Sequence, residues 1–80
     1  MTLYPNPNNG QFRIALSSGT EKSFSLTIVN TLGSVVYRMP ETPFDRDYSS
    51  AIDVAGISPG IYYVIVATAT DNVTRKMLVR

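Results

Sequence analysis

Residues 23–28, which read SFSLTI, decide the fold class of this 80-residue chain. Phe24, Leu26 and Ile28 alternate there with small polar residues, which is the period of a β-strand with one buried face. The same alternation occurs in residues 11–16, QFRIAL, and a polar turn over residues 17–22 separates the two segments. We therefore expect a fold built from strands.

The rest of the chain extends this pattern. Pro40 and Pro43 should end a third strand and open a polar connection to Ser50, because proline cannot donate to a β-ladder. Phe44 and Tyr48 in this connection indicate that part of it packs on the core or pairs as a short edge strand. No segment has the spacing and caps of a helix. Together with the two segments above, the further strands are expected at residues 35–39, 51–54, 61–68 and 74–80. These patterns predict one all-β domain over residues 1–80, an antiparallel sandwich of about six or seven short strands.

Residues 61–68 form the longest expected strand and are apolar on both faces. Ile61, Tyr63 and Ile65 fall on one face, and Tyr62 and Val64 fall on the other. Such a strand is either central and covered on both sides, or its second face meets a partner.

The composition excludes much chemistry. Without histidine or cysteine, the chain lacks the usual general base, the thiol nucleophile and the commonest transition-metal ligands. Asp45, Asp47 and Asp53 are expected to be solvated charges, since a small sandwich leaves little room for a cleft between two carboxylates. Arg46 would oppose a calcium ion between its two neighbours. We predict no enzyme activity, no cofactor and no metal site, while calcium binding by loop oxygens of residues 45–47 or 71–72 stays an open alternative.

Charge and hydropathy set further limits. The net charge is +1 and the basic residues are scattered, so no nucleic-acid surface is expected. The longest apolar run, from Ile61, is too short to cross a bilayer. The first ten residues lack the basic and apolar regions of a secretory signal, which we expect to lie outside this chain if the domain is exported. Most aromatic residues alternate in phase with the aliphatic ones, and this favours core packing over an exposed row for sugar stacking.

The segment Tyr4-Pro5-Asn6-Pro7-Asn8-Asn9-Gly10 has a conformation of its own. Its two prolines favour extended backbone, and Asn-Asn-Gly favours a tight turn into the strand at Phe12. The segment is either a rigid loop that anchors the terminus or a preorganised recognition surface.

Several motifs together resemble the type A C-terminal sorting domain of the type IX secretion system of Bacteroidetes. They are Leu3-Tyr4-Pro5-Asn6-Pro7 with Gly10, Asn30-x-x-Gly33, Ile52-Asp53-Val54, and Ser58-Pro59-Gly60-Ile61-Tyr62-Tyr63-Val64 before a basic last strand. The resemblance covers essentially the whole chain. Ile57 stands where leucine is common, and Arg75-Lys76 replaces the usual Lys-Lys.

The resemblance implies an immunoglobulin-like sandwich of about seven strands that follows a secreted cargo protein. Such a domain directs its cargo from the periplasm across the outer membrane to the cell surface or the medium, and a sortase-like cysteine peptidase then typically removes it. The implied partners are the type IX translocon, this peptidase and a fused N-terminal cargo, with no small-molecule substrate. The cargo and the cleavage site would lie outside this chain.

Carried over by position, the recognition motif comprises Pro5, Asn6, Pro7, Gly10, Gly60, Tyr62, Arg75, Lys76 and Arg80. We hypothesise that the translocon reads the last hairpin through main-chain pairing at its edge and through Arg75, Lys76 and the terminal carboxylate.

Simpler roles remain open for each of these residues. In these simpler roles, Gly60 is needed only for turn geometry, Tyr62 only for packing, and the basic pair only to protect an edge from aggregation. Two other functions also remain open, a carbohydrate-binding sandwich appended to an exported enzyme and a fibronectin-type structural spacer.

Overall fold

The structure is a computed structural model that describes residues 1–17, 22–54 and 56–80. These residues form strands and no helix, so none of them could cross a membrane as a helix. The strands are β1 (Thr2–Tyr4), β2 (Gln11–Ser17), β3 (Ser23–Asn30), β4 (Val35–Pro43), β5 (Asp47–Asp53), β6 (Gly60–Ala67) and β7 (Asn72–Val79). The predicted all-β class is confirmed.

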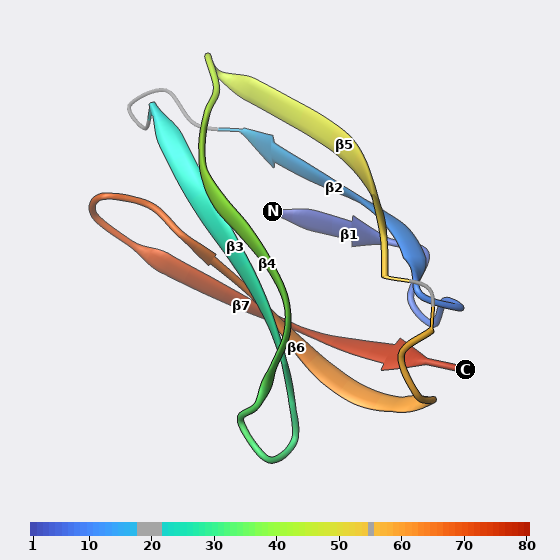
Figure 1. Cartoon of the computed structure of the whole chain (residues 1–80). Helices are drawn as coiled ribbons and strands as arrows, with labels where there is room; N and C mark the ends of the chain where they lie inside the picture. The colour runs from blue at the N-terminus through green and yellow to red at the C-terminus, as the bar shows by residue number, and fades with distance from the viewer. Residues whose placement is uncertain (18–21, 55) are drawn as a thin grey trace.

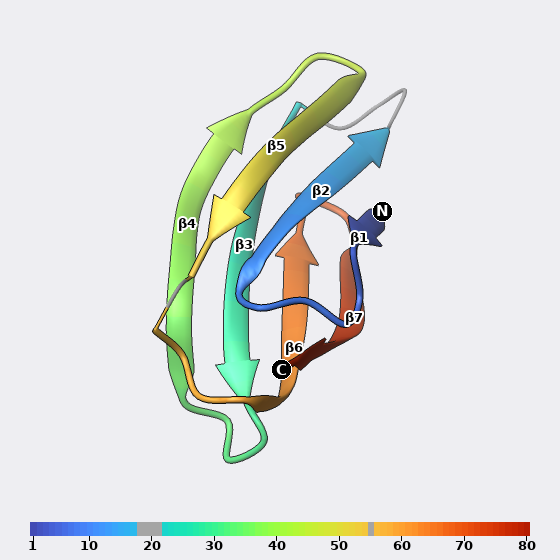
Figure 2. The ribbon, with the colours of Figure 1, turned by 90° about the vertical axis from the view of Figure 1, so that its right-hand side faces the viewer.

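The strands form two antiparallel sheets, β1-β2-β5 and β4-β3-β6-β7, which face each other as two layers (Figures 1 and 2). In the immunoglobulin-like plan, the first, second and fifth strands pack on a sheet that holds the third, sixth and seventh. This chain follows that plan, and its fourth strand joins the second sheet. The predicted sandwich is therefore confirmed.

Alternating side chains of both sheets fill the space between the layers. Ile14 from the first sheet and Leu26, Ile28, Val64 and Met77 from the second have no exposed surface. Burying each such side chain contributes about 1.5–3 kcal/mol, so this layer is the main source of stability in a chain without disulfides.

The connection after β4 packs on the core as expected. The ring of Phe24 lies 5.7 Å from that of Phe44 and 4.8 Å from that of Tyr48, measured between centroids. Tyr48 also belongs to β5, an edge strand that pairs with β2. Both parts of the prediction for this segment are thus confirmed.

The prediction places two strand boundaries wrongly and misses one strand. β4 does not stop before Pro40 but continues to Pro43, because it is an edge strand whose register shifts between Phe24 and Leu26 of β3, and edges and bulges tolerate proline. β5 begins at Asp47 rather than Ala51, and the strand Thr2–Tyr4 was not predicted. Residues 18–21 of the predicted turn lie outside the described residues.

β6 is central, as predicted, but only one of its faces is covered. Tyr62, Val64 and Val66 point into the core, whereas Ile61 and Tyr63 are each 37% exposed on the outer face. Within the described residues nothing packs over that outer face. The expectation of a strand covered on both sides is wrong, and the alternative of a face available to a partner stays open.

Candidate recognition site

The loop formed by residues 5–10 links the two sheets. It leaves β1, at the edge of the first sheet, passes along β7, at the edge of the second, and returns to β2 (Figure 2). The peptide bonds before Pro5 and Pro7 are both cis. The loop thus places the first predicted motif directly beside the last strand.

Asn6 pairs with β7 as a neighbouring strand would. Its carboxamide Nδ2 donates to the carbonyl of Lys76 at 2.8 Å, and its Oδ1 accepts from the amide of Leu78 at 3.0 Å. A carboxamide has the same donor and acceptor as a peptide group. The side chain therefore satisfies two main-chain groups at an edge that would otherwise be open.

Asn8 continues this pairing with its own backbone. Its N–H donates to the carbonyl of Leu78 at 3.0 Å, and its carbonyl accepts from the amide of Arg80 at 2.8 Å. Asn8 is thereby bridged in parallel to Val79. The last residues of the chain are held from both sides, by β6 and by the loop.

The Asn8 side chain fixes the shape of the loop. This side chain is only 7% exposed; its Nδ2 donates to the carbonyl of Pro5 at 3.0 Å, and its Oδ1 accepts from the amide of Gly10 at 2.8 Å. Gly10 has φ +99°, a conformation that glycine adopts without strain, and its carbonyl accepts from the amide of Val54 at 2.8 Å. Asn8 and Gly10 therefore lock the loop against both sheets.

Gly60 and Tyr62 lie where β6 begins. The hydroxyl of buried Tyr62 donates to the carbonyl of Ser58 at 2.6 Å. This is the tyrosine corner of immunoglobulin-like domains, which ties the start of the sixth strand to the preceding turn. Gly60 has φ +152°, and an added Cβ would meet nothing within 4 Å, so only its backbone conformation favours glycine.

The three basic residues do not form one cluster. Arg75 lies opposite Val64 and Lys76 opposite Tyr63, so the two side chains leave opposite faces of β7. Arg80 follows the end of β7, where its amide pairs with Asn8. All three are exposed.

Taken together, the predicted residues gather around β7. The four residues of the first motif lie in the loop at the outer edge of β7. Gly60 and Tyr62 lie on β6, along the inner edge of β7, where they pair with Val79 and Met77. Sequence reasoning missed Asn8, the buried residue of the loop, and the main-chain groups of Leu78. The only signal for Asn8 in the sequence was its position between Pro7 and Gly10, two residues with special backbone conformations.

The loop covers only part of the β7 edge. Lys76, Leu78 and Arg80 direct main-chain groups away from β6, and alternation along a strand gives Thr74 the same direction. β7 pairs with no strand other than β6 in the described part of the chain. Two neighbouring side chains contact this edge, since the Asn72 amide donates to Asp71 Oδ1 at 2.8 Å and the Thr74 carbonyl accepts from the Arg75 guanidinium at 3.3 Å. No strand of the described residues covers the outer edge before Lys76, so this part can accept an added strand.

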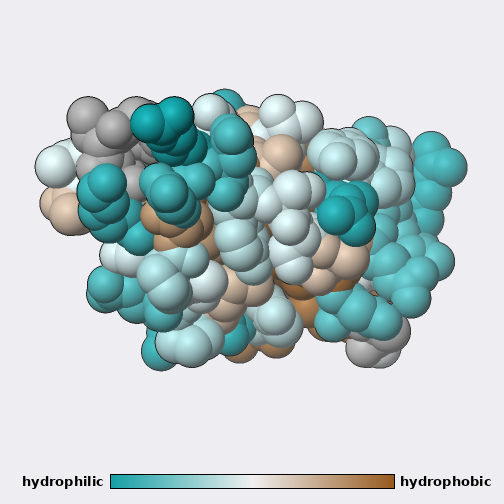
Figure 3. Space-filling model, turned by 90° about the horizontal axis from the view of Figure 1, so that it is seen from above, coloured by the Kyte–Doolittle hydropathy of each residue, from teal (hydrophilic) through white to brown (hydrophobic). Residues whose placement is uncertain are grey.

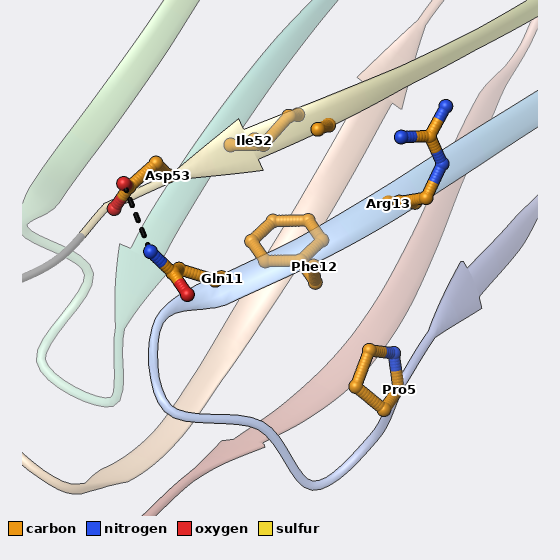
Figure 4. A pocket seen from close by; sticks show the side chains of 7 residues that line it. Pro5, Gln11, Phe12, Arg13, Ile52 and Asp53 are labelled. Carbon is orange, nitrogen blue, oxygen red and sulfur yellow. Dashed lines mark hydrogen bonds between the residues drawn. The ribbon is translucent and has the colours of Figure 1, made fainter.

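An open pocket of about 360 Å³ lies on the outer face of the first sheet (Figure 4). Gln11 donates to Asp53 across it at 3.2 Å, and Arg13 reaches Ser49 at 3.4 Å. Its lining residues are Pro5, Gln11, Phe12, Arg13, Ala51, Ile52 and Asp53. With a single carboxylate, the pocket lacks the acid–base pair that hydrolysis of a sugar would need.

The other predicted candidates remain dispersed. In the 45–47 turn, Asp47 donates from its amide to the carbonyl of Asp45 at 2.7 Å, and Arg46 has φ 67°. No group of three metal-ligating side chains occurs among residues 1–17, 22–54 and 56–80. The exposed aromatic residues Tyr4 and Tyr63 belong to different sheets, so they do not form a row for sugar stacking.

The geometry defines a β-sandwich module whose first loop and last strand form one structural unit. A family model described as the secretion system C-terminal sorting domain matches residues 2–80. The chain belongs to this family, the sorting domains of type IX secretion, which is not a family of catalysts. A search of curated proteins found no match.

Proposed function

We propose that this domain carries a fused cargo through the periplasm and across the outer membrane, and that the type IX translocon reads its β6–β7 hairpin. The supporting observation is the outer edge of β7, which the 5–10 loop leaves open before Lys76. Exposed edges pair readily with an added strand, and main-chain bonds then supply affinity while side chains supply specificity. Arg75 and Lys76 flank the open part, one on each face.

In this proposal the domain is a substrate of the export apparatus. A sortase-like cysteine peptidase removes it after crossing, at a site on the cargo side of β1. Pro5, Asn6, Pro7 and Gly10 contribute by holding the last strand in place, and Gly60 and Tyr62 by fixing the start of β6. Arg75, Lys76 and Arg80 supply positive charge at the strand that is read.

Thr74→Pro tests whether the translocon recognises the outer edge of β7. The N–H of Thr74 points away from β6, so proline leaves the β6–β7 ladder intact but removes an outward donor and obstructs an added strand. Thr74→Val is the matched control, because it keeps the N–H. A fluorescent reporter with a periplasmic signal peptide is fused before each variant in a bacterium that has the system.

We expect the exported fraction to fall about tenfold with Thr74→Pro and to stay unchanged with Thr74→Val. A tenfold fall corresponds to a loss of about 1.4 kcal/mol in the free energy of binding to the translocon. Export of folded Thr74→Pro at the wild-type level would overturn the edge hypothesis. Retention of the wild-type fusion would overturn the sorting function itself. Released reporter that still carries the 8.8 kDa domain would contradict cleavage.

A further inference from the structure

A group of apolar side chains crosses the outer face of the β4-β3-β6-β7 sheet at one end. Leu78 lies opposite Ile61, Tyr63 opposite Val29, and Val29 opposite Val35. Four of the five are between 37% and 48% exposed, and Val29 is partly buried. We call Val29, Val35, Ile61, Tyr63 and Leu78 the outer patch.

The outer patch is local rather than a general property of this face. Further along the same strands, Thr27 lies opposite Ile65 and Ile65 opposite Thr74, and then Ser25 and Asn72 lie opposite Ala67. The patch is at the end of the sheet that holds the β3–β4 turn, the start of β6 and the end of β7 (Figure 1). The opposite end, seen in Figure 3, is mostly hydrophilic, with hydrophobic residues in small separate areas.

The charged side chains around the outer patch have one sign. Lys76 lies opposite Tyr63, Arg38 opposite Thr27 in the next row, and Arg80 follows the last strand. Glu41 accepts from Ser23 at the other end of the sheet, where Asp71 also lies, and the remaining described carboxylate side chains belong to the first sheet or the β4–β5 connection. An apolar surface with a basic rim is complementary to an apolar surface with an acidic rim.

From this arrangement we infer that the outer patch is a second contact surface, which binds an apolar, acid-rimmed face of a protein in the export apparatus. The inference rests on the proposed function for the identity of that apparatus. A second copy of this chain fits poorly, because self-association on this face would bring the side chains of Lys76, Arg38 and Arg80 of both copies together, with no carboxylate side chain of the described residues among them. A bilayer fits less well than a protein. Ile61, Tyr63 and Leu78 belong to a flat sheet face and are each at most 40% exposed, so they do not project far enough to insert among lipids.

Two substitutions of opposite charge at Tyr63 test the proposal in the reporter fusion described above. Tyr63→Glu places a carboxylate beside Lys76 and against an acidic partner, so the exported fraction should fall about tenfold. Tyr63→Lys removes the same aromatic ring but adds a charge of the same sign as the basic rim, so the loss should be only about threefold. Ala51→Glu and Ala51→Lys are the controls, because Ala51 is exposed on the other sheet and lies outside the predicted recognition residues, and they should not alter export.

Competition by the free domain tests whether the outer patch binds a protein of the export apparatus that can be saturated. Excess free domain in the periplasm should lower export of the wild-type fusion, and free domain with Tyr63→Glu should not. Normal export of both Tyr63 variants, with wild-type export intact, would overturn the outer patch but leave the proposed function standing. Flotation of the free domain with phosphatidylglycerol vesicles that Tyr63→Glu abolishes, or a dimer in sedimentation that it dissociates, would also overturn it, in favour of a lipid or a second copy.

Discussion

The two edges of the β4-β3-β6-β7 sheet are protected in different ways. β4 protects itself, since Pro40 and Pro43 lie within the strand and its register with β3 shifts beside them. β7 has no proline and a regular register, and its last residues are covered by the 5–10 loop from the other end of the chain. The first edge is protected by its own sequence, whereas the second is covered only in part, by a separate segment.

This difference teaches how a small sandwich keeps one edge available. Natural sheets block their edges with prolines, bulges and charges, which are permanent features of the strand. A covering loop held by a few hydrogen bonds can leave part of the edge open and fix the rest. The comparison therefore supports the proposal that β7 is the edge that is recognised, whereas β4 carries the features that prevent self-pairing.

The largest expected effect is that of Asn8→Ala. The substitution leaves the buried amide of Gly10 without its acceptor at 2.8 Å and frees the carbonyl of Pro5. An unsatisfied buried group costs about 1–3 kcal/mol, so the free energy of unfolding should fall by about 2 kcal/mol in urea denaturation.

Asn9→Ala is the control, because exposed Asn9 makes a single weaker contact, from the amide of Gln11 at 3.2 Å. Equal losses for the two variants would show that the loop is not fixed by Asn8, and the difference between the two sheet edges would then lose its basis.

Much of the fold could be predicted because it is encoded locally. The alternation around Phe24 and Leu26 defines β3, and Asn30 and Gly33 define the turn after it, where the amide of Gly33 donates to the carbonyl of Asn30 at 3.0 Å. The apolar character of both faces of residues 61–68 predicted a central strand, which is confirmed, but it did not distinguish a covered second face from an exposed one. Periodicity reports such features because each depends only on neighbours in sequence.

The contacts of the candidate site could not be predicted in the same way. Asn6 pairs with Lys76 and Leu78, about 70 residues away, and its carboxamide would suit any strand edge. Pro40 was misread because local rules treat proline as a strand breaker, whereas its effect depends on whether the strand is at an edge. Both outcomes depend on strand order, which alternation does not specify.

A smaller effect is expected for Asn6. Asn6→Ala removes two hydrogen bonds to β7 at an exposed position, which should lower the free energy of unfolding by about 1 kcal/mol. Hydrogen exchange of the Leu78 amide should accelerate, while that of Met77, a buried residue of the same strand, should follow only the global change.

Asn6→Asp separates the two bonds. The carboxylate still accepts from the Leu78 amide but cannot donate to the Lys76 carbonyl, so protection of Leu78 should be retained in part. Full loss of that protection in Asn6→Asp would show that the donor contact, not the strand-like pairing as a whole, holds the edge.

The smallest effect on stability is expected for Pro40→Thr on the opposite edge. Residues 40 and 41 have no register partner on β3, because the register passes from Thr42 opposite Phe24 to Met39 opposite Leu26. Threonine suits a strand, so the free energy of unfolding should change by less than about 0.5 kcal/mol. The new N–H, however, makes β4 a better template for another chain, so sedimentation should show concentration-dependent association that the wild type lacks. A loss of stability without association would mean that Pro40 holds β4 in place rather than protecting its edge. The contrast between a β4 edge protected by proline and a partly open β7 edge would then not hold.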